Sequence, residues 1–426
     1  MGRLSRRHFI GAGIAGCAVL GLPRCASVAK PAKKGVSGDN KRGTRILFSS
    51  RGKVGLIDAD GGVPRYLDFD VPGQVSWHIG PLFSDGQRFV LMSVEGLKTW
   101  EHNVRSHLWI HDPATGVLTE IAARNRPAEY MPACSLLPGE KRIVVNPIID
   151  GEQRIMTMNL DGSDAAEVTH AGEGFCYGVD LSPDGARLAF HASGPEGYRV
   201  FVTDLEGSRR TLVAAHPDHL YFGPTWSLDG EWLLYADCMH KTDPGHDWAD
   251  LCIGRPDGSE HRVVTHGQRH WFGTSYGGPE TRGSGSNISR WSPQKPRCHS
   301  ERDPRNAPSV CTYTRALPNS RTAWPYAVGR PDTDHFNRDY RPEEAHGGTE
   351  ICILDPFTGG VTPITGSTPP VWDFRAAWSP DGNRVAFCRS AVGCPAELWA
   401  MNADGAEPRF LTRGYNDLGA DHPVWL

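Results

Sequence analysis

Two short segments of this chain carry side chains suited to proton transfer and to binding a carboxylate. His219 and Tyr221 lie in one segment, and either could serve as the base that accepts a proton, with the other assisting. Arg338 carries a planar guanidinium whose geometry matches a carboxylate. A base and a carboxylate clamp are the groups that β-elimination beside a uronate carboxylate requires. His219, Tyr221 and Arg338 are therefore the candidate catalytic residues.

The segment 330–340, which contains Arg338, is the densest mixture of charged and aromatic residues in the chain. Long loops in compact folds are usually functional or disordered, and this composition is unlike that of a disordered linker. Asp334 and His335 could bind a divalent metal, manganese or calcium, through carboxylate and imidazole ligands. The alternative is a solvated, self-paired run of charges, and no His-x-x-x-His spacing decides between the two.

The composition limits the classes of protein to which this chain can belong. Its 426 residues include 49 glycines and 33 prolines, which favours many short strands joined by tight turns. The formal net charge of −4 offers no basic surface, so we expect no nucleic-acid partner. No apolar stretch is long enough for a transmembrane segment.

A repeated unit sets the expected fold. Trp378-Ser379-Pro380-Asp381-Gly382 precedes the apolar run 385–387, and the related segments 181–185 and 226–230 precede similar runs. A second turn, rich in Asp, Asn and Gly, separates the third and fourth strands of each unit. It occurs seven times, at 58–61, 112–116, 159–162, 204–207, 255–258, 355–359 and 402–405. Seven turns predict seven four-stranded blades.

The two ends of the chain complete this pattern. The first unit, from Ile46 onward, lacks an innermost strand, and the segment 422–426 supplies one that belongs to no other unit. Pairing these segments would remove open sheet edges. We therefore expect an all-β, seven-bladed β-propeller over residues 44–426, closed by pairing of the C-terminal strand with the first blade.

These units resemble the TolB-like, or PD40-type, propeller repeat, which is also seen in the propeller of dipeptidyl peptidase IV and in oligogalacturonate lyase. The resemblance covers residues 44–426, implies the propeller fold and is nearly silent on function. Oligogalacturonate lyase-type propellers use a divalent metal held by His and Gln before the last complete innermost strand. Here that stretch reads Trp372-Asp373-Phe374-Arg375, which departs from their pattern.

One face of such a propeller collects the loops that precede the innermost strands and those that join the second strand of a blade to the third. His, Tyr and Trp recur in these loops. Any single one could be a packed structural residue, but together they predict a ligand site over the central axis. The candidate ligand-binding residues are His78, Tyr177, His191, His270, Trp271, Trp372 and His422.

Two functions fit this pattern. The first is an exported, carbohydrate-active propeller that catalyses lyase-like β-elimination on uronate-containing oligosaccharides, with a small polar or oligosaccharide ligand. The second is a non-catalytic TolB-like propeller that binds a glycan, a peptide or an envelope protein.

The N-terminal segment has the features of an export signal. Ser5-Arg6-Arg7-His8-Phe9-Ile10 is a twin-arginine motif, and an apolar, glycine-rich stretch follows to residue 22. We expect cleavage after Ala29, a linker over 30–43, and a periplasmic or secreted protein. An uncleaved anchor and a lipid on Cys17 are the alternatives.

Oxidising surroundings would permit disulfides. Cys238 and Cys252 flank one hairpin loop, and Cys388 and Cys394 flank another, so both pairs are candidates.

Overall fold

The computed structural model describes residues 44–95, 105–121, 131–194, 197–239, 248–265, 290–293, 311–316, 349–368, 371–391 and 394–426. The chain divides into two compact units, Met1–Asp39 and Asn40–Leu426, and every described residue lies in the second. The described part is all-β, apart from one short 3-10 turn at Tyr415–Asp417. Within it, no helix is both long and apolar enough to cross a membrane.

The first three sheets hold the N-terminal strands and, in one case, the last strand of the chain. The first sheet contains β1 (Arg45–Ser50), β2 (Lys53–Asp58), β3 (Arg65–Leu67) and β30 (Asp421–Trp425). The second contains β4 (Gln74–Leu82), β5 (Phe89–Glu95), β6 (Ser106–Asp112) and β7 (Val117–Ile121). The third contains β8 (Ala133–Leu136), β9 (Arg142–Val145), β12 (Met156–Asn159) and β13 (Ala166–Glu167), with the hairpin β10 (Ile148–Ile149) and β11 (Glu152–Gln153) beside it.

The remaining strands form two further four-stranded sheets and one of eight strands. The fourth sheet contains β14 (Phe175–Leu181), β15 (Arg187–Gly194), β16 (Gly197–Asp204) and β17 (Thr211–Ala214). The fifth contains β18 (His219–Trp226), β19 (Leu233–Met239), β20 (Trp248–Gly254) and β21 (His261–Val263). The eight-stranded sheet contains β22 (Arg290–Trp291), β23 (Cys311–Ala316), β24 (Thr349–Asp355), β25 (Gly360–Pro363), β26 (Val371–Trp378), β27 (Arg384–Ala391), β28 (Glu397–Asn402) and β29 (Arg409–Thr412).

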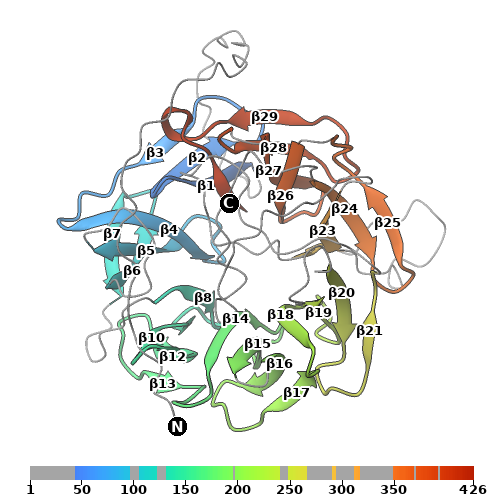
Figure 1. The fold of residues 1–426 in the computed structure, drawn as a ribbon. Coiled ribbons are helices and arrows are strands. Elements are labelled where there is room, and N and C mark those ends of the chain that lie inside the picture. The colour runs from blue at the N-terminus through green and yellow to red at the C-terminus, as the bar shows by residue number, and fades with distance from the viewer. Residues whose placement is uncertain are drawn as a thin grey trace, which may run out of the picture. The chain divides into compact units, whose positions relative to one another are not determined.

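These sheets follow one another around a ring in chain order, which is the arrangement of a β-propeller (Figure 1). The pairing gives six principal sheets among the described residues, where the turn count predicts seven. The difference comes from one parallel residue pair, Thr349 with Trp372, which joins β24 to β26. Two antiparallel groups of four strands thereby become one eight-stranded sheet.

The repeated Ser-x-Asp-Gly segments form the turns between first and second strands, as predicted. In the segment 181–185, the Ser182 hydroxyl donates to Oδ1 of Asp184 over 2.5 Å, and Gly185 adopts a φ of +71°. The same contact joins Ser379 to Asp381 over 2.6 Å. Glycine supplies the positive φ and the short polar side chains satisfy the turn, so the segment forms the same turn in each copy.

The first and last strands of the described part meet in the first sheet. β30 pairs antiparallel with β1, with Trp425 opposite Ile46 and Val424 opposite Leu47. The Trp425 indole N–H donates to the Ala377 carbonyl over 2.9 Å, which ties the last strand to β26 as well. Trp425 is only 4% exposed, so the final strand belongs to the core.

The core lies between neighbouring sheets. One cluster joins Phe83, Val90 and Leu108 of the β4–β7 sheet to Ile143 and Met158 of the next sheet. Each such side chain contributes about 1.5–3 kcal/mol on burial. Contacts of this kind hold each sheet against its neighbours and fix the loops at the ring axis.

The predicted disulfides are wrong for the described cysteines: Cys252, Cys388 and Cys394 form no disulfide bond. Cys238 pairs with Ala249, whereas Cys252 pairs with Tyr235, three residues before Cys238 on β19. The two cysteines are therefore not cross-strand partners in this register. Cys388 is buried between strands, while Cys394 lies in the loop that follows β27.

Candidate functional site

Strand register gathers polar side chains on one face of the β18–β21 sheet. Tyr221 pairs with Asp237, Asp237 pairs with Asp250, and Tyr235 pairs with Cys252. Paired residues point to the same face, and so do residues two apart on one strand. This face therefore presents two carboxylates and a thiol among apolar groups of the neighbouring β14–β17 sheet.

His219 forms an ion pair at the start of this face. Its Nδ1 lies 2.8 Å from Oδ1 of Asp237, whose side chain is 2% exposed, while 19% of the His219 side chain is exposed. Burial raises the pKa of the Asp237 carboxyl, and His219 opposes that rise. A carboxylate that orients an imidazole in this way is the usual support of a histidine that accepts a proton. Sequence reasoning proposed His219 but missed Asp237, which only the register reveals.

Tyr221 lies beside His219, with ring centroids 6.0 Å apart. It is 5% exposed, and burial, with Asp237 as a further cause, raises the pKa of its phenol. A buried phenol beside a carboxylate resists ionisation, so His219 is the better base of the two.

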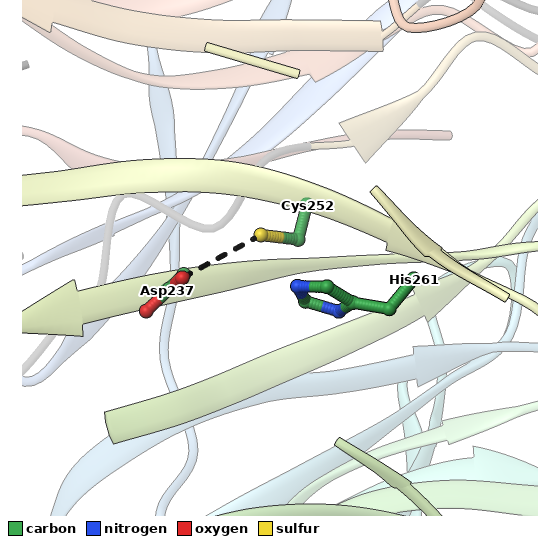
Figure 2. A group of neighbouring side chains, drawn as sticks. All are labelled: Asp237, Cys252 and His261. Atoms are coloured by element: carbon green, nitrogen blue, oxygen red, sulfur yellow. Dashed lines mark hydrogen bonds between the residues drawn. The ribbon is translucent and has the colours of Figure 1, made fainter. Parts of the chain in front are cut away.

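Cys252 and His261 extend the cluster toward the outer strand. The Cys252 thiol donates to Oδ2 of Asp237 over 3.9 Å, and Nδ1 of His261 lies 2.6 Å from the Tyr235 hydroxyl. Figure 2 shows the His261 ring turned toward Asp237 and Cys252. The ligand-type atoms of Asp237, Cys252 and His261 all lie within 4.8 Å of one another.

A second group of polar residues lies on innermost strands, and we call His78, Arg375, Asp421 and His422 the axis cluster. The guanidinium of Arg375 lies between two partners. Its Nη1 donates a hydrogen bond to Nε2 of His422 over 2.7 Å, and its Nε lies 2.6 Å from Oδ1 of Asp421. The Arg375 side chain is 8% exposed, whereas that of His422 is 46% exposed. Arg375 can only donate, so the bond leaves the His422 proton on Nδ1.

The histidines of the axis cluster are uncharged at neutral pH. Burial, with His422 as a further cause, lowers the pKa of His78 to about 3. Partial desolvation of the ring, followed by the Arg375 charge, lowers the pKa of His422 to about 4. These imidazoles can therefore exchange hydrogen bonds with a ligand, but they carry no charge to offer it.

Arg375 and His422 also share an uncommon backbone conformation, with φ of +54° and +50°. They occupy the bulge of their innermost strands, where β14 and β18 have Gly178 and Gly223. Glycine adopts this conformation freely, whereas other residues are strained in it. Two copies of the repeat have glycine at this bulge position, whereas two others have Arg375 and His422. This difference could have identified Arg375 as a candidate site residue from the sequence, but it was not used.

Two other candidate residues, His191 and Trp372, are buried, and a third, Tyr177, lies against His191. His191 is 3% exposed, stacks edge-on against Tyr177 at 4.0 Å, and accepts a hydrogen bond from the Gly223 backbone N–H over 3.3 Å. Trp372 is 2% exposed. His191 and Trp372 thus support the innermost strands and, as placed, offer little surface to a ligand. His270, Trp271, Asp334, His335 and Arg338 lie outside the described residues.

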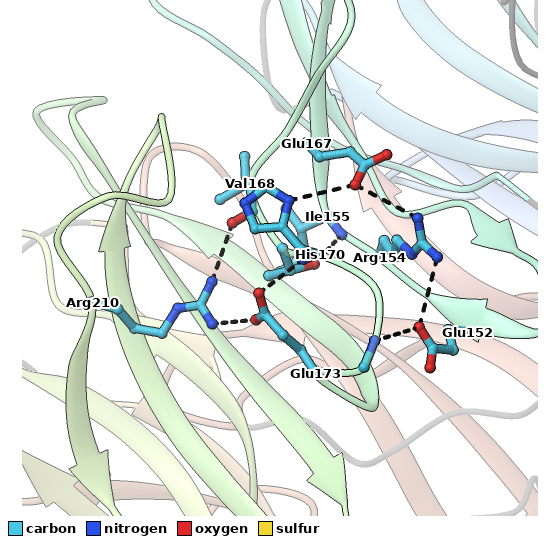
Figure 3. Close-up of polar contacts among 10 residues, drawn as sticks. Glu152, Arg154, Ile155, Glu167, Val168, His170, Glu173 and Arg210 are labelled. Carbon is cyan, nitrogen blue, oxygen red and sulfur yellow. Dashed lines mark hydrogen bonds and ion pairs between the residues drawn. The ribbon is translucent and has the colours of Figure 1, made fainter.

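A third polar cluster links the β8–β13 and β14–β17 sheets (Figure 3). Arg210 pairs with Glu173 and donates to the Val168 carbonyl over 3.1 Å, while Arg154 lies 3.6 Å from Glu167. Each cation has protein anions close by, so we assign this cluster to packing between sheets.

Comparisons with known proteins support the fold. The chain matches, over 88% of its length, 52% of a puromycin-hydrolyzing peptidase from Mycobacterium tuberculosis, with 15% identity and a TM-score of 0.54. It also matches, again over 88% of its length, 97% of the β-propeller domain of the Trilobed protease from Pyrococcus furiosus, with 12% identity and a TM-score of 0.50. The chain is a β-propeller. It spans about half the length of that peptidase, and at these identities the likeness shows the fold alone.

Looser matches add nothing further. TolB from Acinetobacter baumannii aligns with a TM-score of 0.44 and 14% identity, over 90% of this chain and 66% of TolB. The uncharacterized peptidase YuxL of Bacillus subtilis (strain 168) is 37% identical over 79 residues, which is 18% of this chain and 11% of YuxL. No protein-family model matches the chain.

Proposed function

We propose that the protein is a ligand-binding propeller that takes a small polar ligand, such as an oligosaccharide, at the axis cluster. The observation that carries the proposal is the Arg375–His422 contact of 2.7 Å between two residues strained at matching bulge positions. Strained backbone concentrates at ligand clamps and active sites, because the surroundings there hold a side chain in place at a cost in stability.

The charges of the cluster indicate the class of ligand. Arg375 is already paired with Asp421, and His78 and His422 are neutral, so the described cluster carries no net charge. Neutral imidazoles match hydroxyl and carbonyl groups better than a second carboxylate. We therefore favour hydroxyl recognition, and a uronate carboxylate would need the predicted clamp Arg338.

Titration calorimetry with short neutral and uronate-containing oligosaccharides tests this proposal. His422→Ala should weaken binding at least about tenfold, or about 1.4 kcal/mol. His170→Ala is the matched control, since the His170 side chain is 64% exposed and pairs only loosely with Glu167 at 3.5 Å. Equal binding by the wild type and His422→Ala would place the site elsewhere.

A second candidate function is lyase-like β-elimination on a uronate-containing oligosaccharide. The His219–Asp237 pair at 2.8 Å favours it, because it supplies an oriented imidazole. An absorbance assay for the unsaturated product should show turnover that His219→Gln lowers by a factor of 10² or more. Tyr221→Phe should keep most of the turnover if His219 is the base. Absence of any unsaturated product across the panel would leave binding as the function.

We further infer that the eight-stranded sheet consists of two blades, which gives seven blades in all. Support comes from the single residue pair that joins its two antiparallel halves. On this proposal β30 closes the ring by completing the sheet of β1, β2 and β3.

Export through the twin-arginine route to the periplasm or beyond completes the proposal. It rests on Arg6 and Arg7, which lie outside the described residues. Lysine at both positions should block transport, and the exported protein should begin near Lys30. An exported protein that retains residues 1–29 would contradict the cleavage.

A further inference from the structure

The β18–β21 sheet holds a set of side chains whose chemistry the proposed ligand site does not use. Among the described residues, Asp237, Cys252 and His261 bring a carboxylate, a thiol and an imidazole within 4.8 Å of one another (Figure 2). They come from three adjacent strands, β19, β20 and β21. We propose that these three residues bind one divalent cation, of the zinc class.

The ligand set fits that class. Thiolate, imidazole and carboxylate are the ligands of zinc sites, whereas calcium and magnesium select oxygen. Tetrahedral zinc with bonds of about 2.0–2.3 Å places its ligand atoms roughly 3.5 Å apart. The Cys252 Sγ to Asp237 Oδ2 distance is 3.9 Å. Small side-chain movements would therefore bring the ligands to bonding distance.

Neighbouring groups orient two of the ligands. Nδ1 of His261 lies 2.6 Å from the Tyr235 hydroxyl, and if Nδ1–H donates to that oxygen, the Nε2 lone pair is free for the metal. Oδ1 of Asp237 is held by His219 at 2.8 Å, which leaves Oδ2 toward Cys252. Such outer partners fix the tautomer and direction of metal ligands.

The charge of the cluster favours a cation. Asp237 and Asp250 are opposite one another in register and are 2% and 6% exposed. Thr265 donates to Asp250 over 2.8 Å, and Nδ1 of His219 lies 2.8 Å from Oδ1 of Asp237. Two carboxylates are costly to bury side by side in apolar surroundings, and a divalent cation bound between them would lower that cost.

The thiol and the outer histidine complete the case. The Cys252 thiol donates to Oδ2 of Asp237, and a bound cation would displace that thiol proton. The imidazole of His261 would bind the cation in its neutral form. His261 is exposed on the outer strand, which gives an ion access to the buried pair.

Cobalt(II) tests the site directly, because thiolate coordination produces an intense ligand-to-metal charge-transfer absorption. The full chain, freed of metal with a chelator, should bind one equivalent of cobalt at this site with that absorption and release it to zinc. Cys252→Ser should abolish the thiolate absorption, whereas Cys311→Ser should retain it, since Cys311 is equally buried and contacts the Leu354 carbonyl instead.

His261→Asn is a second test variant. Because His261 lies exposed on the outer strand β21, we expect this substitution to leave the packing of the core unchanged. It should weaken cobalt binding at least about tenfold, or about 1.4 kcal/mol. A wild-type protein that binds cobalt without thiolate absorption, or an absorption that persists in Cys252→Ser, would overturn the proposal.

Discussion

The guanidinium of Arg375 donates a hydrogen bond to Nε2 of His422 across 2.7 Å, although the two residues lie 47 positions apart. The bond joins β26 to β30, so it couples the axis cluster to the strand that ends the chain. Both residues adopt a positive φ, which costs stability in residues other than glycine. Substitutions at this contact should therefore change both the stability of the protein and its binding of a ligand.

Glycine and alanine at position 422 should differ in stability. Both substitutions remove the imidazole, but glycine adopts a φ of +50° without strain and alanine does not. We expect His422→Gly to be about 1 kcal/mol more stable than His422→Ala. Urea unfolding of the two variants measures the difference directly. Equal midpoints would show that the backbone at this position relaxes without cost.

Removal of the Arg375 charge should be costly. Asp421 is 10% exposed and its carboxylate lies 2.6 Å from the Arg375 Nε. Arg375→Met leaves that carboxylate buried without its cation, and we expect a loss of about 3–5 kcal/mol in the free energy of unfolding. The double variant Arg375→Met/Asp421→Asn should recover part of the loss, because the uncompensated charge is gone. A double variant no more stable than Arg375→Met alone would count against an ion-pair origin of the effect.

The last strand should be essential to the stability of the first sheet. Trp425→Ala deletes a side chain that is 4% exposed and donates to the Ala377 carbonyl, so we expect a loss of about 3–5 kcal/mol. Deletion of residues 421–426 should lower the melting temperature further, since it also exposes the edge of β1. Val63→Ala is a control, because Val63 is 88% exposed. Unchanged melting in the deletion variant would show that the ring does not depend on β30.

His107 should make stability depend on pH near neutrality. Its Nε2 lies 2.6 Å from Glu95 and its Nδ1 lies 2.8 Å from Glu120. Burial lowers the pKa of His107, but the bonds to Glu120 and Glu95 together outweigh burial and raise it above the ordinary value of 6.5. A raised folded-state pKa gives stability that is full below about 6.5 and is lost as pH rises through the folded-state pKa.

The measurement is the difference in unfolding free energy between wild type and His107→Gln at a series of pH values. The advantage of the wild type should shrink between slightly acidic and mildly alkaline pH. A difference that grows with pH would mean that His107 is held neutral in the folded protein.

The sequence by itself determined the fold class. The segments 181–185 and 378–382 predicted turns, and they connect β14 to β15 and β26 to β27. These features are local: a Ser, an Asp and a Gly within five residues satisfy a turn wherever the flanking strands lie. The all-β propeller could therefore be predicted, while the joining of β24 to β26 through Thr349 and Trp372 could not.

Only the tertiary structure decided which side chains meet. His219 was evident as a candidate, but its partner Asp237 lies 18 positions later and faces it because of the β18–β19 register. Register also pairs Cys252 with Tyr235 instead of Cys238, and it brings Cys252 close to Asp237 and His261. A shift of one residue in strand pairing turns every side chain of the strand to the other face of the sheet. The register is set by packing between sheets, so a local sequence pattern does not predict it.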